Sequence, residues 1–235
     1  MKYLSIGTSP RTIKSDNQGE YLTAIMYMRP NIDICAMSTI ASCLDGCLDT
    51  AGRGAMSNVQ AARQRKTDAF MDDPVAFVDQ LKADVRKGIK RAAKGGLKLA
   101  VRPNGTSDIP FENLPGSNGL TLMEEFPDEI FYDYTKLIGR KVPANYHLTV
   151  SYSGANDAFA SKVLKSPHNI AVVFDTKKGE QLPWNFNGRE VIDGDLTDLR
   201  FLDPVGVVIG LRAIGRARDD SSGFVVSSNT LAMAG

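Results

Sequence analysis

Three cysteines are the residues of this chain best suited to chemistry. Cys35, Cys43 and Cys47 are the only cysteines in the sequence, and their spacings are C-x7-C and C-x3-C. Thiolates are soft ligands that prefer iron–sulfur clusters, zinc or cuprous copper. A closed zinc site normally takes four protein ligands, whereas three thiolates suit a 4Fe-4S cluster with one iron left open. We therefore expect Cys35, Cys43 and Cys47 to hold such a cluster.

Two other interpretations of the cysteines remain open. A zinc ion would need a fourth ligand, and the two histidines, His147 and His168, are the alternatives, although neither has local ligand spacing. Free cysteine is also a common small core residue, so all three thiols can be structural. The concentration of the three in one loop, with none elsewhere, favours a metal.

Composition and charge narrow the class of protein. Hydrophobic residues make up 43% and charged residues 23%, which is typical of a soluble globular protein with a sizeable core. The formal net charge of +1 argues against a general electrostatic nucleic-acid binder. The sequence has no apolar run of membrane-spanning length and no signal-peptide core near its start. We expect a cytoplasmic protein without a membrane partner, where clustered cysteines usually bind metal or do chemistry.

Short apolar strands, each followed by polar side chains and a connector, account for most of the chain. We expect helices at 57–70, 74–94, 120–126 and 155–165, a short strand at 3–6, and strands at 21–28, 97–102, 129–134, 146–151, 169–174, 190–192 and 207–211. This repeat is typical of a (β/α) barrel or a related parallel sheet. Because several connectors are short and lack a clear helix, we predict a partial or distorted (β/α) barrel of the α/β class.

One α/β domain is expected over residues 1–235, with an irregular lead-in at 1–19 and a cysteine loop at 29–54. The cysteine loop follows the apolar run 21–28, and the carboxyl ends of strands are where such folds bind ligands. Polar side chains at these ends offer hydrogen-bond groups to a small ligand. The candidate cofactor-binding residues are Arg53, Arg102, Asn104, Asp108, Asp133, Lys136 and Asp195.

These polar clusters have structural alternatives. The residues after 102 can form a satisfied turn network, and Arg53 lies in a glycine-rich turn that is as compatible with helix entry as with anion binding. Asp193, Asp195 and Asp198 can bind a hard cation or a ribose, or can pair with Arg200. The basic stretch 86–94 reads either as a solvated helix face or as a nucleic-acid contact.

Four motifs resemble a family of phage and prophage proteins, the gene-product-eighty-eight family, over almost the whole chain. They are Cys35, Cys43 and Cys47 running into Leu48–Gly54, Val101–Asp108, Phe131–Lys136, and Asp193–Asp203. The resemblance implies a viral or mobile-element origin, and hence the host cytoplasm. It implies no settled activity, because the family is mostly uncharacterised.

A more distant resemblance is to the radical S-adenosylmethionine enzymes. Three cysteines follow the first long apolar strand and an α/β barrel pattern follows them, although the usual C-x3-C-x2-C spacing and glycine-rich motif are absent. The resemblance implies S-adenosylmethionine on the open iron and hydrogen abstraction from an unknown substrate. The alternative is a non-catalytic phage protein that binds a host protein or nucleic acid and uses zinc or iron as a structural pin. A fourth protein ligand, such as His147, would distinguish the second function from the first.

Overall fold

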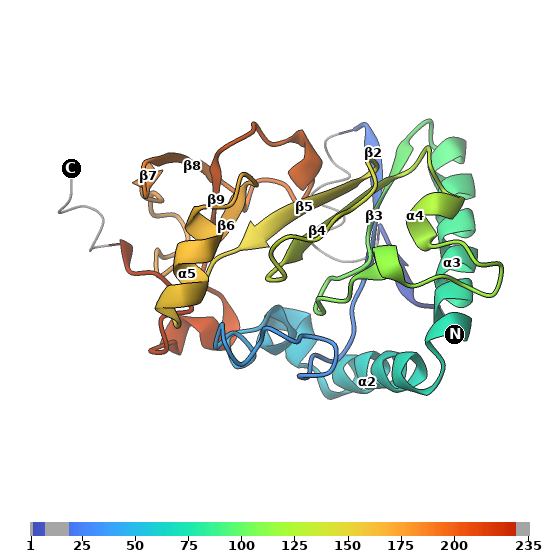
Figure 1. Ribbon diagram of the computed structural model, residues 1–235, viewed down its shortest axis with the longest axis horizontal. Helices are drawn as coiled ribbons and strands as arrows, with labels where there is room; N and C mark the ends of the chain where they lie inside the picture. Colours follow the sequence, from blue (N-terminus) through green and yellow to red (C-terminus); the bar gives the residue numbers. More distant parts are fainter. Residues whose placement is uncertain (1, 8–18, 229–235) are drawn as a thin grey trace.

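A mostly parallel β-sheet organises the computed structural model, which describes residues 2–7 and 19–228 (Figure 1). The nine strands of the described residues lie in the order β1-β2-β3-β4-β5-β6-β9-β8-β7. Only the outermost pairs, β1 with β2 and β7 with β8, are antiparallel. The strands are β1 (Leu4–Ile6), β2 (Tyr21–Met26), β3 (Lys98–Arg102), β4 (Ile130–Thr135), β5 (Tyr146–Ser151), β6 (Ile170–Phe174), β7 (Asn185–Phe186), β8 (Arg189–Asp193) and β9 (Val208–Arg212).

The helices occupy some of the connections between these strands. The β8–β9 connection holds a 3-10 turn alone, and the β4–β5 and β6–β7 connections have neither. The α-helices are α2 (Ser57–Asp72), α3 (Pro74–Lys94), α4 (Leu122–Glu125) and α5 (Asp157–Leu164), and the 3-10 turns are η1 (Leu48–Thr50), η2 (Gly52–Ala55), η3 (Phe111–Asn113), η4 (Arg200–Leu202) and η5 (Gly215–Asp219). Asp73 caps α3 by accepting a 3.0 Å hydrogen bond from the Ala76 backbone N–H, and Pro74 occupies the first turn. Helix α2 begins at Ser57, and its N-cap residue is Met56, which makes no side-chain capping hydrogen bond.

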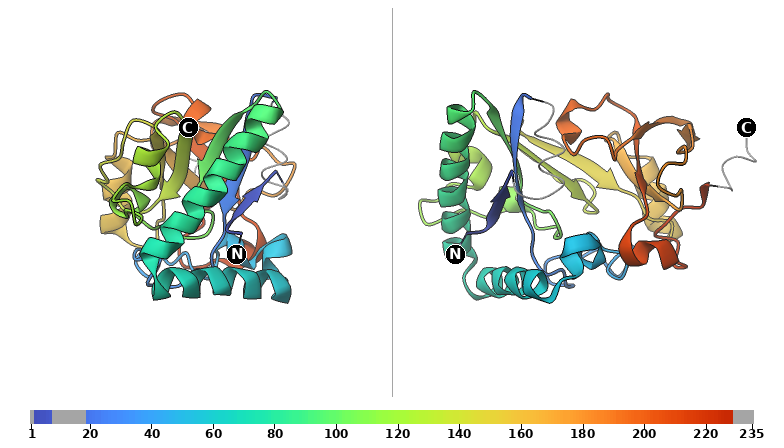
Figure 2. Two further views of the ribbon diagram at one scale, coloured as in Figure 1. Left: turned by 90° about the vertical axis from the view of Figure 1, so that its right-hand side faces the viewer. Right: turned by 180° about the vertical axis from the view of Figure 1, so that it is seen from behind.

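The core lies on both faces of the sheet. Every residue of β2 is buried, as its continuous apolar run predicts for an inner strand of a parallel sheet. On one face, Phe77, Leu81 and Val85 of α3 join the largest buried cluster, beside β1, β2 and β3. On the other face Leu199, from the segment between β8 and β9, packs with Tyr21 and Tyr132. Figure 2 shows α2 lying crosswise to α3 at one end of the sheet.

The α/β class is confirmed, but the sheet is open rather than closed into a barrel. Closing a barrel requires the first and last strands to pair, whereas β1 and β7 lie at opposite ends of the strand order. Strands β2 to β6 nevertheless neighbour one another in sequence order and run parallel, so their carboxyl ends share one edge. Residues 8–18 of the predicted lead-in lie outside the described residues. No helix in the described ranges is long and apolar enough to span a membrane.

Candidate functional site

A cavity of about 190 Å³ opens at the carboxyl ends of the parallel strands. This volume is many times the roughly 10–15 Å³ that a single water needs. The cysteine loop forms one wall, the ends of β3, β4, β5 and β9 form another, and the segment after β9 closes it. Its lining includes Cys35, Ser38, Cys43, Cys47, Arg102, Asn104, Asp108, Tyr134, Lys136, Ser151, Asp195, Arg212 and Phe224.

Tight turns bring the three cysteines to this cavity. The backbone N–H of Ser38 donates to the Cys35 carbonyl (2.9 Å), and the N–H of Cys43 donates back to the Ser38 carbonyl (3.2 Å). The N–H of Cys47 then donates to the Leu44 carbonyl (3.3 Å). All three cysteines are half-buried and free of disulfides. Cysteines that are widely spaced in the sequence therefore line one cavity.

The two ends of the loop are anchored to regular structure. At its start, the Thr106 hydroxyl donates to the Met28 carbonyl (2.6 Å), and the Asp108 N–H donates to the Ile34 carbonyl (2.8 Å). After Cys47, the buried Asp49 in η1 pairs with Arg63 of α2. These contacts fix the loop between the β3 end and α2, so the cysteines have a defined position.

Burial governs the protonation of the thiols. Desolvation, with a contribution from the neighbouring cysteines, raises the pKa of Cys35 to about 12 and raises that of Cys47 as well, while Lys136 opposes both shifts. These two thiols are therefore neutral near pH 7 when nothing is bound. Binding as thiolates requires a positively charged partner, which a metal supplies because it deprotonates a coordinating thiol.

The histidines that the zinc alternative would use as a fourth ligand do not line the cavity. The His147 ring lies 5.9 Å from the Phe201 ring between centroids, and neither His147 nor His168 is among the residues that line the cavity. Within the described part of the chain, no group of three or more Cys, His, Asp or Glu residues is arranged to hold a metal ion. The donors present are three soft sulfurs that share a cavity without a histidine.

Arg102 lines the cavity but is already engaged. Its Nη1 lies 3.1 Å from each carboxylate oxygen of Asp198, and its guanidinium stacks 4.5 Å from the Tyr134 ring centroid. Asp198 also accepts a 3.3 Å hydrogen bond from the Tyr132 hydroxyl. Arg102 therefore contributes a positive wall that is compensated from behind by a buried carboxylate.

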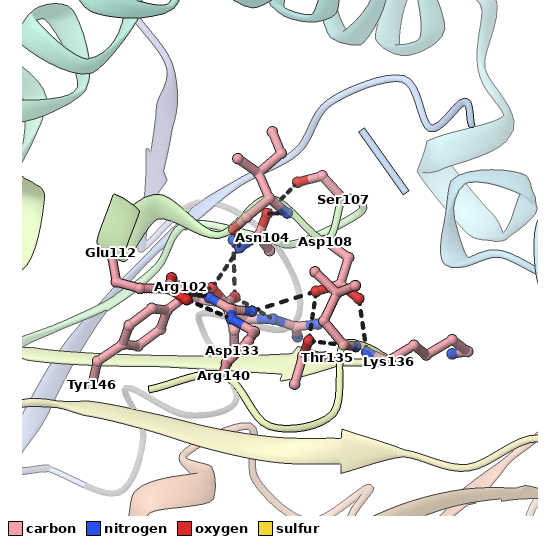
Figure 3. Close-up of polar contacts among 12 residues, drawn as sticks. Arg102, Asn104, Ser107, Asp108, Glu112, Asp133, Thr135, Lys136, Arg140 and Tyr146 are labelled. Atoms are coloured by element: carbon pink, nitrogen blue, oxygen red, sulfur yellow. Dashed lines mark hydrogen bonds and ion pairs between the residues drawn. The ribbon is translucent and has the colours of Figure 1, made fainter. Parts of the chain in front are cut away.

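Asn104, which lines the cavity, and Asp133, which lies behind the cavity wall, share a hydrogen-bond network (Figure 3). Asp133 is fully buried, is not among the lining residues, and accepts from the Asn104 N–H and Nδ2 (both 2.9 Å) and the Tyr146 hydroxyl (2.7 Å). Asn104 also accepts from Ser107 Oγ (2.7 Å) and the Ile109 N–H (2.8 Å). These groups hold the β3 and β4 ends together, and their hydrogen-bonding capacity is largely used within the protein.

Asp108, from the segment after β3, contacts Lys136 just beyond the carboxyl end of β4 (Figure 3). Asp108 accepts from Thr135 Oγ1 and the Lys136 N–H, both at 2.7 Å, and lies 3.4 Å from Arg140 Nη1. The Lys136 ammonium donates to Ser151 Oγ (2.8 Å) and lies 5.3 Å from the Phe224 ring centroid. The Asp108 carboxylate thus fixes the backbone from which Lys136 reaches into the cavity.

The remaining candidate residues, Asp195 and Arg53, differ in whether they line the cavity. Asp195 lines the cavity and pairs with Arg212 at 3.0 Å, as does Asp193. The three aspartates expected to hold a cation or a ribose therefore face arginines, since Asp198 pairs with Arg102. Arg53 is exposed in η2 and is not among the lining residues.

Comparison with known protein families bears on all of these residues. Residues 5–228 match the family model described as Gene product 88. The chain belongs to the Gene product 88 family. No curated protein and no solved structure matches the chain, so the resemblance to radical S-adenosylmethionine enzymes stays a prediction.

In this Gene product 88 protein, several residues that line the cavity are not among the candidates expected from the sequence. Ser151 ends β5 and carries the same strand-end signal as Lys136, so it was available to pattern reasoning. Arg212 ends β9, at the edge where the other parallel strands end. Phe224 comes from an irregular segment, and no local pattern predicts that it reaches the cysteine loop.

Proposed function

We propose that this chain is an iron–sulfur protein whose three cysteines hold a 4Fe-4S cluster beside a small-ligand site. The supporting observation is that all three thiols line the same cavity as Lys136 and Asp195, which come from the strand ends. A shared cavity is what a cluster with one open iron needs, because the ligand of that iron must also contact the protein.

The kind and number of donors suit such a cluster, although the described residues do not already gather them into a metal-binding arrangement. Cys35, Cys43 and Cys47 supply three soft ligands, and neither His147 nor His168 lines the cavity. A three-thiolate cluster leaves one iron for a ligand that is not a protein side chain. The cost of burying thiolates also favours a cationic partner at this position.

We further propose S-adenosylmethionine as the ligand of this site and an enzymatic role on an unknown substrate. The cluster would supply an electron to the bound cofactor, and the protein would position it. Support comes from the cysteine loop that follows β2, the first parallel strand, and from the sequential order of β2 to β6. A relation between this sheet and the barrel of the radical S-adenosylmethionine enzymes is part of the same proposal.

A non-catalytic role is the second candidate. Several polar groups at the strand ends, notably Asn104 and Asp133, hydrogen-bond within the chain, as expected of a scaffold. In this role zinc or iron would pin the cysteine loop and stabilise the fold, and the protein would bind a host protein or nucleic acid.

Metal analysis of protein purified without oxygen tests the cluster. We expect about four irons and about four sulfides per chain, with the absorption of a cluster. The Cys35→Ala/Cys43→Ala/Cys47→Ala variant should lose them. Ile40→Ala should retain them, because Ile40 is an exposed residue of the same loop and does not line the cavity.

Other outcomes separate the candidates. One zinc per chain, lost in the triple variant, would support the structural pin. Absence of any metal in the wild type would overturn both metal-based roles. If the cluster forms, addition of S-adenosylmethionine to the dithionite-reduced protein should change the electron paramagnetic resonance signal of the cluster, and an unchanged signal would remove the proposed cofactor while leaving the cluster.

A further inference from the structure

We propose that the ligand of this cavity presents an oxyanion, a carboxylate or a phosphate group, to Lys136. The inference deepens the proposed function, and rests on its small-ligand site, but it does not depend on the cluster. It is based on the balance of charge in the cavity, on buried donors that lack acceptors, and on the way the chain fixes Lys136.

The charge balance singles out Lys136. The arginines that line the cavity face carboxylates: Arg102 faces Asp198, and Arg212 faces Asp193 and Asp195. Within the part of the chain that the structure describes, the Lys136 ammonium has no carboxylate within ion-pair distance. Among the described residues the ammonium donates to the Ser151 hydroxyl, lies over the Phe224 ring and acts electrostatically on the Cys35 and Cys47 thiols. These thiols are neutral when nothing is bound, so the charge of Lys136 is available to an anion.

Two further groups of the cavity wall lack an acceptor among the described residues. Ser38 is buried, and its hydroxyl has no hydrogen-bond partner. Arg212 Nε is also buried and without a hydrogen-bond partner. Buried donors are normally satisfied by protein, water or a ligand. Both atoms are covered by their neighbours, so a rotation of each side chain would have to bring them to the acceptor oxygens of a bound oxyanion.

The chain fixes the direction from which Lys136 approaches. Its backbone N–H is held by Asp108, and Arg140 lies behind that carboxylate and also pairs with Glu112 at 2.6 Å. In Figure 3 the Lys136 side chain extends away from this network. Apolar side chains such as Val173, Leu211 and Phe224 line the same cavity, and the reduced polarity strengthens an ion pair formed there.

Titration of the full chain with small anions tests the proposal. Inorganic phosphate and acetate would be added separately, with sodium chloride holding the ionic strength constant, and amide shifts would be followed by nuclear magnetic resonance. We expect saturable shifts around Lys136 for at least one anion. The anion that binds more tightly identifies the group, and absence of saturable binding of either would overturn the proposal.

Two charge-matched variants locate the site. Lys136→Gln should raise the Kd by about tenfold or more, because a charge-assisted hydrogen bond is lost, and Lys136→Arg should restore most of the affinity. Lys141→Gln removes the same charge from an exposed position off the cavity and should change the Kd by less than about twofold. Equal Kd values for the wild type and Lys136→Gln would overturn the assignment.

The cysteine variant separates this inference from the metal proposal. Anion binding should persist in the Cys35→Ala/Cys43→Ala/Cys47→Ala chain, because the donors lie on other residues. Iron without anion binding would overturn only the oxyanion site, and anion binding without iron would overturn only the cluster. Ser151→Ala gives an independent check if Lys136→Gln does not fold, since loss of the Ser151 contact should change the Kd without removing the charge.

Discussion

Asp133 is a carboxylate that is fully buried, whereas a carboxylate at a strand end is normally solvated. It is fully buried at β4, where it accepts hydrogen bonds from Asn104 and Tyr146 and lies 3.9 Å from Arg102 Nε. Burial outweighs these contacts and raises the pKa of the Asp133 carboxyl from 3.8 to about 6. The folded protein therefore holds this proton more tightly than the unfolded chain.

This shift predicts a pH dependence of stability. Between about pH 4 and pH 6 the folded state carries more of the Asp133 proton than the unfolded state, so the free energy of unfolding falls as pH rises. The contribution of Asp133 changes by about 3 kcal/mol across this window. Asp133→Asn removes the titrating group. The unfolding free energy of the wild type minus that of the variant should therefore fall by this amount as the pH rises from about 4 to about 6.

Urea unfolding at a series of pH values measures the difference. The exposed Asp128→Asn variant removes one carboxylate while keeping Asp133, and it should retain the fall seen in the wild type. If the difference in unfolding free energy between the wild type and Asp133→Asn stays constant from pH 4 to pH 7, Asp133 titrates outside this window.

The ends of β2 and β3 are the elements on which the cysteine loop depends. The chain leaving β3 passes directly over the end of β2, and the Gly105 N–H donates to the Met26 carbonyl at 2.8 Å. A Cβ on Gly105 would lie 2.5 Å from that carbonyl oxygen and 2.7 Å from Ile25 Cγ2. Only glycine allows this approach, and the cysteine loop begins just beyond it.

Gly105→Ala should therefore force the two strand ends apart. We expect a loss of about 1–3 kcal/mol in the free energy of unfolding, the usual cost of overpacking. Gly95→Ala is the matched control, because its nearest neighbours are 3.5 Å away and its φ is −91°. It should change stability by at most about 0.5 kcal/mol. Equal losses in urea unfolding would contradict the close approach at Gly105.

At the scale of the whole molecule, the segment after β9 completes the cavity. This segment contacts the sheet, because the Val226 N–H donates to the Val173 carbonyl (2.8 Å). It also contacts the loop after β5, where the Gly154 N–H donates to the Gly223 carbonyl (2.8 Å). Between these contacts Phe224 packs so closely on the cysteine loop that a Cβ on Gly46 would lie 3.0 Å from its ring. Figure 1 shows this red segment beside the blue cysteine loop.

Phe224→Ala should open this contact. We expect a loss of about 3–5 kcal/mol in stability and a faster reaction of the metal-free cysteines with a thiol reagent under native conditions. Phe201→Ala is the control, since Phe201 packs with Tyr21 and Tyr132 in a different cluster. It should destabilise the chain without a matching rise in thiol reaction rate. Equal rates in the two variants would mean that Phe224 does not shield the loop.

Much of the architecture follows from local pattern. The apolar run at 21–28 predicts an inner strand, which the structure forms over Tyr21–Met26, and Asp73 with Pro74 predicts the start of α3. Parallel strands share an edge, which explains why Lys136 and Asp108 were expected beside the cysteines and do line one cavity with them. The two-residue strand β7 is too short to leave a periodic signal, and it was not predicted.

The placement of the candidate residues was only partly predictable. Strand-end position suggested that Asp133 faces a ligand, but hydrogen bonds from Asn104 and Tyr146 hold it behind the wall. Arg212 and Phe224 join the cavity through contacts that no spacing reveals. Such choices depend on which polar groups find partners across the fold.

The sequence by itself determined the grouping of the three cysteines in one loop, most strands and helices, the parallel character of the sheet and the edge at which polar groups gather. These features arise from composition and short-range periodicity, which act within a few residues. Only the tertiary structure decided that the sheet stays open, that among the described residues carboxylates compensate Arg102 and Arg212 but not Lys136, and that the segment after β9 closes the cavity. Strand-edge pairing, charge compensation and desolvation join residues that are distant in the chain, and their free energies depend on the complete fold.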